Sequence, residues 1–218
     1  TSTWMNSKRC MQKNNMDDRQ THRLAHIDFA LPQSQIDSIY ETVNELRQKQ
    51  EQAKVQNKLD FEVDKSYRDC VSVSIPTYHW FAGMIWHHIM RTNDHNFQFD
   101  ITCFGSDAIE FMSYERGGQY KWHVDDLGHP LFQDIPKVRE QRQTFTEWQR
   151  KLSFSLLLNE EYEGGELQIL YPPKKLYKIP KKTGHLVIFA SRALHRVTPV
   201  KSGRRDALVG WVVGPRWR

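Results

Sequence analysis

Cysteine is scarce in this chain, whose 218 residues include only Cys10, Cys70 and Cys103. The three lie far apart, so they form neither a Cys-x-x-Cys motif nor the even-numbered set of a disulfide framework. Isolated cysteines of this kind are typical of proteins in a reducing compartment. We therefore expect free thiols, in the core or at the surface, and a cytoplasmic protein.

Long hydrophobic runs are absent as well. No apolar stretch approaches the roughly 20 residues that a membrane-spanning helix needs, and the first residues, TSTWMNSKRCMQKNN, lack the apolar segment of a signal peptide. Neither an internal repeat nor a linker divides the chain. We expect no membrane partner and a single domain over residues 24–218. It would follow a flexible N-terminal segment, residues 1–23, which is rich in Asn, Gln, Asp and Lys.

Negative charge is in modest deficit, because 26 Asp and Glu face 31 Lys and Arg, which gives a net charge of +5. Part of the excess lies in YPPKKLYKIPKK, residues 171–182, and in the tail from residue 202 onward. A basic surface suits an acidic polypeptide or a nucleic acid. No nucleic-acid-binding motif accompanies the charge, however, and a solvated lysine-rich loop is the simpler interpretation of residues 171–182.

Helical periodicity is confined to the first half of the chain. The segment 31–54 places its apolar residues on one side of a helix that Pro32 and Ser34 would start. The segment 77–94 does the same after an alternating strand at 71–76. The apolar positions are Ile36, Ile39, Tyr40, Val43 and Leu46 in the first helix, and Trp80, Phe81, Met84, Ile85, His88 and Ile89 in the second. We expect both helices to cover one sheet.

From about residue 97 the sequence changes to short runs rich in β-branched and aromatic residues, separated by turns. They span 97–104, 108–114, 120–125, 152–159, 165–171, 185–191, 195–200 and 207–214. Many short strands predict a mainly β fold, with a jelly-roll (double-stranded β-helix) core over about 97–215. Flanking α-helices within about 24–96 would support this core. The charged segment 127–150 interrupts the strands as a loop or a partly helical excursion.

A histidine and an aspartate follow a Gly-Gly turn in SYERGGQYKWHVDDLGH, residues 113–129. If residues 120–125 form a strand, His123 and Asp125 point to the same face, because alternate residues of a strand do so. An imidazole and a carboxylate on one face suit Fe(II), Mn(II) or Zn rather than Cu(I). A third ligand must come from elsewhere in the chain.

His195 stands out among the other histidines. It follows one predicted strand and opens the next, and a jelly roll brings strands that are distant in sequence side by side. Two histidines and one carboxylate form the facial triad of non-haem Fe(II) oxygenases, which leaves three metal positions open. The alternatives are His22, His26 and His95, which are most simply solvated; His79, His87 and His88, which fit packing or surface roles; His129, a candidate outer neighbour; and His185, which is left without a role.

Three open metal positions would accept O2 and a chelating 2-oxo acid, whose second carboxylate needs a fixed cation. Arg205 lies ten residues after His195, on the strand that follows a turn at Gly203. Its guanidinium can hold a carboxylate through two parallel hydrogen bonds. The neighbouring Arg204 alternates to the opposite face and should face solvent.

Three motifs occur together and in order. They are Y-x-x-G-G-x-Y-x-x-H-x-D from Tyr114 to Asp125, RKLSFSLLLNEEYEGGEL at residues 150–167, and H-R-V-T-P-V-x-x-G-x-R-x-A-x-x-x-W from His195 to Trp211. In this combination the chain resembles the Fe(II)/2-oxoglutarate-dependent dioxygenases of the prolyl 4-hydroxylase superfamily, and within it the bacterial PKHD-type hydroxylases. The resemblance covers residues from about 97 to 215.

The resemblance implies a role for each matching position, and none of these is catalytic beyond the metal ligands. The metal ligands would be His123, Asp125 and His195, and the cosubstrate-binding residues would be Arg205, Tyr114, Tyr120 and Trp211. For Tyr120 and Trp211 a plain aromatic core is the competing interpretation, and Gly164 with Gly165 would only shape a turn. The implied cofactors are Fe(II), 2-oxoglutarate as cosubstrate and O2, with ascorbate as an accessory candidate.

The implied reaction hydroxylates an unactivated C–H bond and releases succinate and CO2. A prolyl residue of a protein or peptide is the first choice of substrate, by analogy with the family alone, while free amino acids and small metabolites stay open. The alternatives are a nucleic-acid demethylase of the same iron chemistry and a non-catalytic cupin-like metal-binding module.

Two features depart from the family or lie outside its pattern. Animal prolyl hydroxylases often have lysine where this chain has Arg205, so the details of their pocket do not transfer. The segment 127–150 follows the predicted ligand strand, and we expect it to act as a mobile lid over the substrate.

Overall fold

The computed structural model describes residues 24–28, 31–57, 66–105, 108–126, 148–171 and 175–217, with side chains of the first helix up to residue 48. The predicted flexible segment 1–23 and almost all of the predicted lid at 127–150, including His129, lie outside these residues. Both therefore stay predictions, as does the division into one domain and an N-terminal segment.

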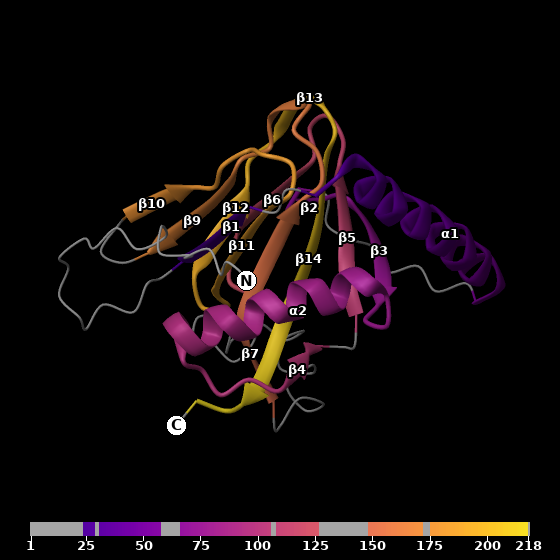
Figure 1. Ribbon diagram of the computed structural model, residues 1–218. Coiled ribbons are helices and arrows are strands. Elements are labelled where there is room, and N and C mark those ends of the chain that lie inside the picture. The colour runs from indigo at the N-terminus through magenta and orange to yellow at the C-terminus, as the bar shows by residue number, and fades with distance from the viewer. Residues whose placement is uncertain are drawn as a thin grey trace, which may run out of the picture.

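Two antiparallel sheets face each other in the described part of the chain and form a jelly roll (Figure 1). The larger sheet has the order β1-β11-β7-β14-β5-β3, with β4 also pairing with β14, and the smaller sheet has the order β10-β9-β12-β6-β2. The larger sheet contains β1 (Leu24–Asp28), β3 (Val71–Pro76), β4 (Cys103–Phe104), β5 (Ala108–Tyr114), β7 (Trp148–Leu157), β11 (His185–Ala190) and β14 (Arg205–Pro215). The smaller sheet contains β2 (Arg68–Asp69), β6 (Gln119–His123), β9 (Leu167–Tyr171), β10 (Lys175–Lys178) and β12 (Leu194–Val197), and a separate pair joins β8 (Tyr162–Gly164) to β13 (Val200–Gly203). The mainly β jelly roll predicted from the sequence is confirmed.

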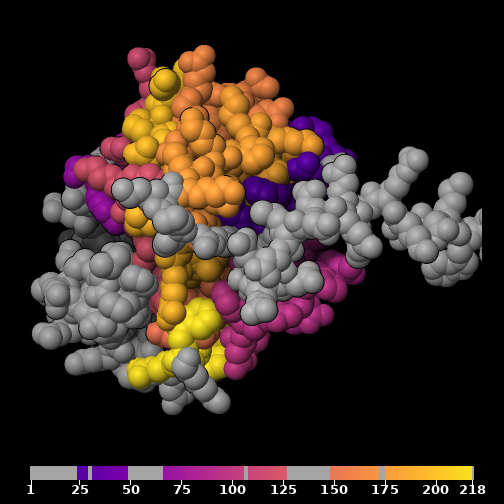
Figure 2. Space-filling view, turned by 90° about the vertical axis from the view of Figure 1, so that its left-hand side faces the viewer, coloured from indigo at the N-terminus to yellow at the C-terminus, as the bar shows by residue number. Residues whose placement is uncertain are grey.

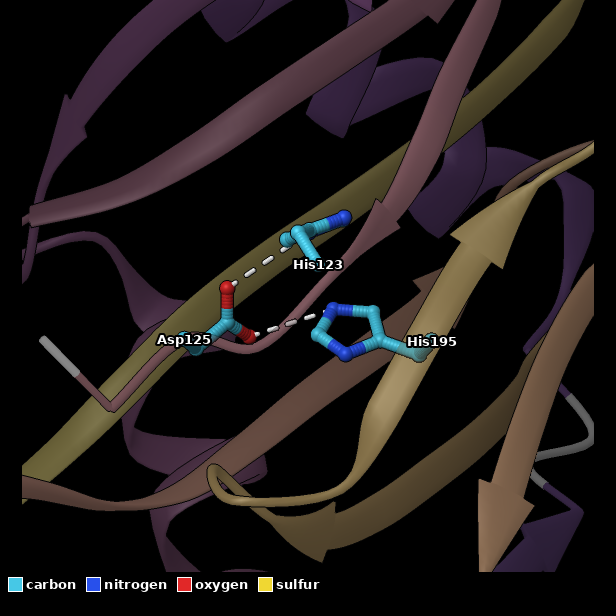
Figure 3. Close-up of side chains that lie close together, drawn as sticks. All are labelled: His123, Asp125 and His195. Carbon is cyan, nitrogen blue, oxygen red and sulfur yellow. Dashed lines mark ion pairs between the residues drawn. The ribbon is translucent and has the colours of Figure 1, made fainter. Parts of the chain in front are cut away.

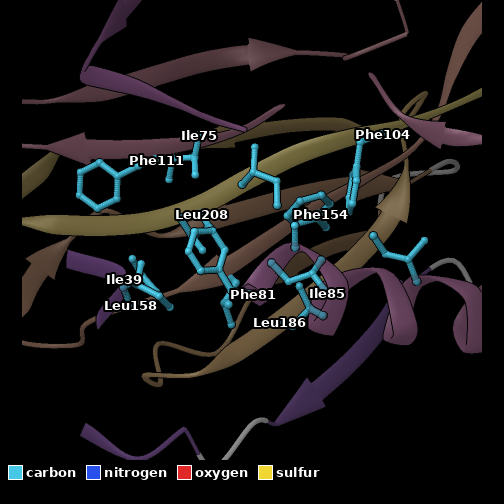
Figure 4. Packing of buried hydrophobic residues seen from close by; sticks show 14 of the residues in the cluster. Ile39, Ile75, Phe81, Ile85, Phe104, Phe111, Phe154, Leu158, Leu186 and Leu208 are labelled. Carbon is cyan, nitrogen blue, oxygen red and sulfur yellow. The ribbon is translucent and has the colours of Figure 1, made fainter. Parts of the chain in front are cut away.

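The helices α1 (Gln33–Asn57) and α2 (Trp80–Thr92) pack on the outer face of the larger sheet. Their apolar sides meet the strands in one continuous core, which Figure 4 shows from close by. The core residues include Ile36, Ile39 and Val43 of α1, Phe81, Ile85 and Ile89 of α2, and Ile75, Phe111, Phe154 and Leu208 of the strands. In Figure 2 the magenta surface of α2 lies below the orange surface of the later strands. The two helices cover one face of the larger sheet, so its opposite face can line the interior of the jelly roll.

The predicted details of α2 and of the strand after it are partly wrong. The periodicity predicts Trp80 in the apolar stripe, but its side chain is 43% exposed, because the buried side of the helix follows Phe81 and Ile85. The predicted strand 97–104 begins instead in a π-helix, Asn93–Phe97, and only β4 at its end pairs. The Asn93 side chain bonds both backbone groups of Phe99, at 2.9 Å each, and so directs the chain away from an extended path.

The basic segment around residue 175 is not the predicted loop. Lys175–Lys178 forms β10, an edge strand that pairs with β9. Its lysines are exposed, as expected, and lysines on an edge strand discourage pairing with other chains. No helix in the described part of the chain is long and apolar enough to cross a membrane.

A strand that the sequence did not indicate, β1, closes the edge of the larger sheet by pairing with β11. His26 is exposed, as predicted, and contacts His185 through ring nitrogens 3.0 Å apart, while the other ring nitrogen of His185 lies 2.5 Å from an oxygen of Asp28. Asp28 also pairs with Lys182 at 3.2 Å. These polar contacts link β1 to β11 and to the residues just before it.

We expect acidification to loosen β1. Partial desolvation of its ring lowers the pKa of His26 and the nearby His185 lowers it further, while Asp28 opposes them. A lowered folded-state pKa favours neutral His26, so this stabilisation is present above the ordinary value of about 6.5 and is lost as the pH falls below it. Hydrogen exchange of the Leu24–Asp28 amides, corrected for the chemical rate, should lose protection between roughly pH 7.5 and 5.5. His26→Gln should remove the pH dependence, and a pH-dependent exchange that survives this change would show that His26 is not its source.

Candidate metal and cosubstrate site

Three buried side chains converge between the two sheets (Figure 3). His123 ends β6 and lies directly opposite His195 of β12 in the strand register. The Nε2 atom of His123 lies 3.7 Å from Oδ1 of Asp125, and the Nε2 atom of His195 lies 3.3 Å from Oδ2. One ligand atom from each residue lies within 4.8 Å of the others, and this is the one such group of three in the described residues.

Asp125 reaches this point for a reason other than the predicted one. Strand β6 ends at His123, so strand alternation does not place the carboxylate. Instead the backbone amides of Asp125 and Asp126 both donate to the carbonyl of Ser191, at 2.9 and 3.0 Å. The hydroxyl of Ser153 donates to Oδ2 of Asp125 at 2.7 Å and lies 2.9 Å from the hydroxyl of Ser191. A buried hydroxyl pair therefore fixes the aspartate after the strand has ended.

The two imidazoles are oriented by their own backbone. Nδ1 of His123 lies 2.7 Å from the carbonyl of Lys121, and Nδ1 of His195 lies 2.9 Å from the carbonyl of Ala193. Because a carbonyl can only accept, each Nδ1 carries the proton and each Nε2 presents a lone pair to the centre. Metal-bound histidines are oriented in the same way, because the ring nitrogen that does not bind the metal donates its proton to a nearby acceptor.

The electrostatics favour a divalent cation. Burial and the neighbouring His195 lower the pKa of His123 to about 4, so this imidazole is neutral near pH 7. Burial alone would raise the pKa of Asp125, but His195 and His123 hold it well below its ordinary range. The pKa of His195 is lowered by burial but raised overall by Asp125. Two imidazole nitrogens and one carboxylate suit Fe(II), Mn(II) or Zn, so the residues fit the metal that the triad implies.

A cavity of about 50 Å³ lies against the triad, and every other sequence-predicted site residue lines it. These residues are Tyr114, Tyr120, Arg205 and Trp211. The ring of Tyr120 stacks on His123 with centroids 3.6 Å apart, and burial raises the pKa of its phenol to about 12. Tyr114 is 3% exposed, and burial raises the pKa of its phenol too. Both phenols are therefore protonated and can donate a hydrogen bond into the cavity.

Arg205 is a buried cation with a hydrogen-bond donor that has no partner among the described residues. It lies opposite Tyr114 in the register of β14 and β5, with its guanidinium 5.5 Å from the centre of that ring. The side chain is 3% exposed, and its Nε has no hydrogen-bond partner among the described residues. A buried donor without a partner costs free energy, and a carboxylate would satisfy it. Arg204 is half exposed, which agrees with its predicted orientation toward solvent, and it pairs with Asp206.

The sequence interpretation missed Tyr162 and undervalued Gly165. Tyr162 is buried and lines a cavity together with Arg205, whose charge opposes the rise that burial causes in the pKa of the phenol. Gly165 has a φ of +58°, and a Cβ there would lie 3.0 Å from Tyr162 and 3.2 Å from Cδ of Arg205. Gly165 is thus more than a turn residue, because the absence of a side chain leaves room for the aliphatic part of Arg205. The signal was present in the motif at 150–167, where the tyrosine lies two residues before the Gly-Gly pair.

Arg150 is a second missed residue near the triad. Its guanidinium stacks on the ring of Trp211 at 3.9 Å, and its Nη1 lies 3.5 Å from the carbonyl oxygen of Asp125. Burial lowers its pKa, although Asp125 opposes this shift. Trp211 therefore belongs to a cation–aromatic pair beside the triad, rather than to a plain aromatic core.

Removing the Ser153 hydroxyl should weaken metal binding. In Ser153→Ala the carboxylate of Asp125 loses its donor, and loss of such an outer partner typically weakens metal affinity about 10–100-fold. A Mn(II) titration followed by electron paramagnetic resonance measures this. Ser113→Ala is the matched control, because it removes another buried serine–aspartate bond, of 2.6 Å to Asp206, away from the triad. Equal Mn(II) affinity in the two variants would show that Ser153 does not position the ligand.

The jelly-roll region of the chain is similar to known sequences. A profile of the 2OG-Fe(II) oxygenase superfamily matches residues 109–213. A PKHD-type hydroxylase of Parvibaculum lavamentivorans is 40% identical over 108 residues, which are 48% of this chain and 41% of that protein. A PKHD-type hydroxylase of Hyphomonas neptunium is 50% identical over 64 residues, 28% of either chain. The matched segments thus span less than half the length of these relatives.

Comparison with solved structures concerns the fold. A prolyl-4-hydroxylase of Pseudomonas putida aligns with a TM-score of 0.60 and 20% identity, over 90% of this chain and 95% of that one. A prolyl hydroxylase of Trichoplax adhaerens, solved with a peptide fragment of hypoxia inducible factor, aligns with a TM-score of 0.62 and 18% identity, over 88% and 84%. At these identities the likeness shows a shared jelly-roll architecture.

Proposed function

Since the jelly roll of this chain is that of a 2OG-Fe(II) oxygenase resembling the PKHD-type hydroxylases, we propose that it hydroxylates an unactivated C–H bond, with a prolyl residue of a protein or peptide as substrate. The observation that carries this proposal is one cavity lined both by the buried triad of His123, Asp125 and His195 and by the incompletely paired Arg205. A metal-binding module without turnover has no use for the buried arginine.

Each residue has a separate task in this proposal. The triad holds Fe(II), and Arg205 together with Tyr162 holds the distal carboxylate of 2-oxoglutarate. Tyr114 donates a hydrogen bond to the cosubstrate, while Tyr120 and Trp211 form the aromatic walls that exclude water. When bound, Fe(II) and 2-oxoglutarate supply the oxidising chemistry, in which O2 is consumed and succinate and CO2 are released. Ascorbate would serve as an accessory reductant.

Two observations support a polypeptide as the substrate. The walls nearest the triad are aromatic, and an aromatic surface suits a proline ring. The basic net charge suits an acidic target. The structurally similar Trichoplax enzyme was solved with a peptide fragment bound, and a peptide is accordingly the first class to test.

Turnover assays on candidate substrates test the proposal. Protein loaded with Fe(II) and 2-oxoglutarate without oxygen is exposed to O2 with a proline-containing peptide library, and succinate and peptide mass are then measured. We expect succinate release coupled to the gain of one oxygen atom by a peptide, and none with the same peptides carrying hydroxyproline. Stimulation by alkylated DNA instead of peptides would favour the demethylase, and absence of any succinate would favour an inert metal-binding module.

A further inference from the structure

A second and larger cavity adjoins the first at Arg205. It has a volume of about 390 Å³, within the range of small-molecule pockets, whereas the cavity beside the triad has about 50 Å³. The two cavities share Ser155, Leu167 and Arg205, and the larger one touches none of the triad residues. Arg205 therefore stands in the partition between them.

The rim of the second cavity is formed by the end of β10 and by the segment that leads to β11. Lys178, Pro180 and Lys181 are exposed, and Ile179 beside them is half buried. Lys178 pairs with Glu166 at 3.3 Å, and Lys181 donates to the carbonyl of Tyr162 at 2.6 Å. This cavity thus leads from the surface to the buried arginine.

The lining of this cavity attracts anions. The charged residues in the lining include three cations, Lys178, Lys181 and Arg205, and one carboxylate, Glu166. Walls with an excess of one charge and an apolar remainder raise the local concentration of oppositely charged ligands and speed their association. A small dicarboxylate has the charge that this lining selects.

We propose that the second cavity is an access route by which 2-oxoglutarate reaches Arg205, and by which succinate leaves, without passing the metal-side mouth. The inference rests on the proposed function. A dicarboxylate that arrives from this side meets Arg205 before it meets the triad. A substrate polypeptide bound across the metal-side mouth would then block neither loading of the cosubstrate nor release of the product.

A plug in the route is the first test. Ile179→Trp enlarges a half-buried lining residue at the rim. The probe is 2-oxoglutarate itself, mixed anaerobically with the Fe(II)-loaded protein, and the visible absorption of the chelate reports association and dissociation. Narrowing a route slows both directions equally, so we expect both rate constants to fall about tenfold with an affinity within about twofold of the wild type.

Charge reversal at the rim is the second test, and it keeps the inference testable if the plug disturbs folding. The double variant Lys178→Glu with Lys181→Glu should slow association about tenfold at low salt, and the difference should shrink as salt rises. The control, Lys175→Glu with Arg91→Glu, has the same net charge but changes exposed residues that do not line the cavity. It should remain within about twofold of the wild type.

The outcomes separate this inference from the proposed function. Unchanged rates in both rim variants, with a normal chelate, overturn the route alone. Faster dissociation with unchanged association in Ile179→Trp makes the cavity a wall of the binding site and also overturns the route. If the wild type forms no chelate, the proposed function fails, and the route fails with it.

Discussion

Replacing His195 or His123 with alanine should abolish iron retention and turnover while the protein remains folded. Each change leaves two of the three candidate ligands, so the loss of metal affinity should exceed the roughly 10–100-fold that loss of an outer partner causes. The hydrophobic core against α1 and α2 contains neither histidine, so we expect the fold to survive their replacement. Metal content after dialysis against Fe(II), succinate production and the circular dichroism spectrum measure the three parts of this expectation.

A histidine outside the site provides the control for these variants. His79 is half buried and does not line the metal-side cavity, so His79→Ala should keep metal and turnover. Wild-type activity in His123→Ala or His195→Ala would contradict the ligand assignment. Loss of the folded spectrum in both variants would show instead that the imidazoles are structural.

Replacing Arg205 with alanine should weaken 2-oxoglutarate binding about 100-fold and leave metal binding nearly unchanged. Removing a charge-assisted pair of hydrogen bonds in a buried site corresponds to about 3 kcal/mol. Arg205→Lys should have an intermediate affinity, because it keeps the charge but loses the planar two-point contact. Anaerobic titration of the Mn(II)-loaded protein with 2-oxoglutarate measures all three affinities.

The neighbouring arginine is a close control for Arg205. Arg204 lies one residue earlier in the chain, and its side chain is 51% exposed and pairs with Asp206 at 3.0 Å. Arg204→Ala should leave the cosubstrate affinity within about twofold. If Arg204→Ala and Arg205→Ala had the same effect, the basic charge of this region, rather than the position of one guanidinium, would determine binding.

The sequence predicted the parts of the site that depend on strand pattern and on motif spacing. The run Ala108–Tyr114 has the boundaries of β5, and the prediction that strands distant in sequence would bring His195 to His123 is confirmed by their direct pairing. Arg205 faces the same cavity as the triad because its strand, β14, pairs with β5. Alternation along a strand and a known order of motifs carry enough information for these positions.

The rest depends on contacts that no local pattern records. Asp125 lies beyond its strand and is held by Ser153 and Ser191, which come from distant segments. The strand β1 forms through pairing with β11, although its own five residues show no distinctive alternation. The Asn93 side chain, rather than strand propensity, determines the path of the chain before β4.

A crystal structure of the protein soaked without oxygen in Mn(II) and 2-oxoglutarate tests the central claim most directly. We expect one anomalous peak equidistant from the ligand atoms of His123, Asp125 and His195, with a dicarboxylate extending from it to the guanidinium of Arg205. A manganese ion bound elsewhere, or a dicarboxylate that does not touch Arg205, would contradict the claim that these four side chains form one oxygenase site.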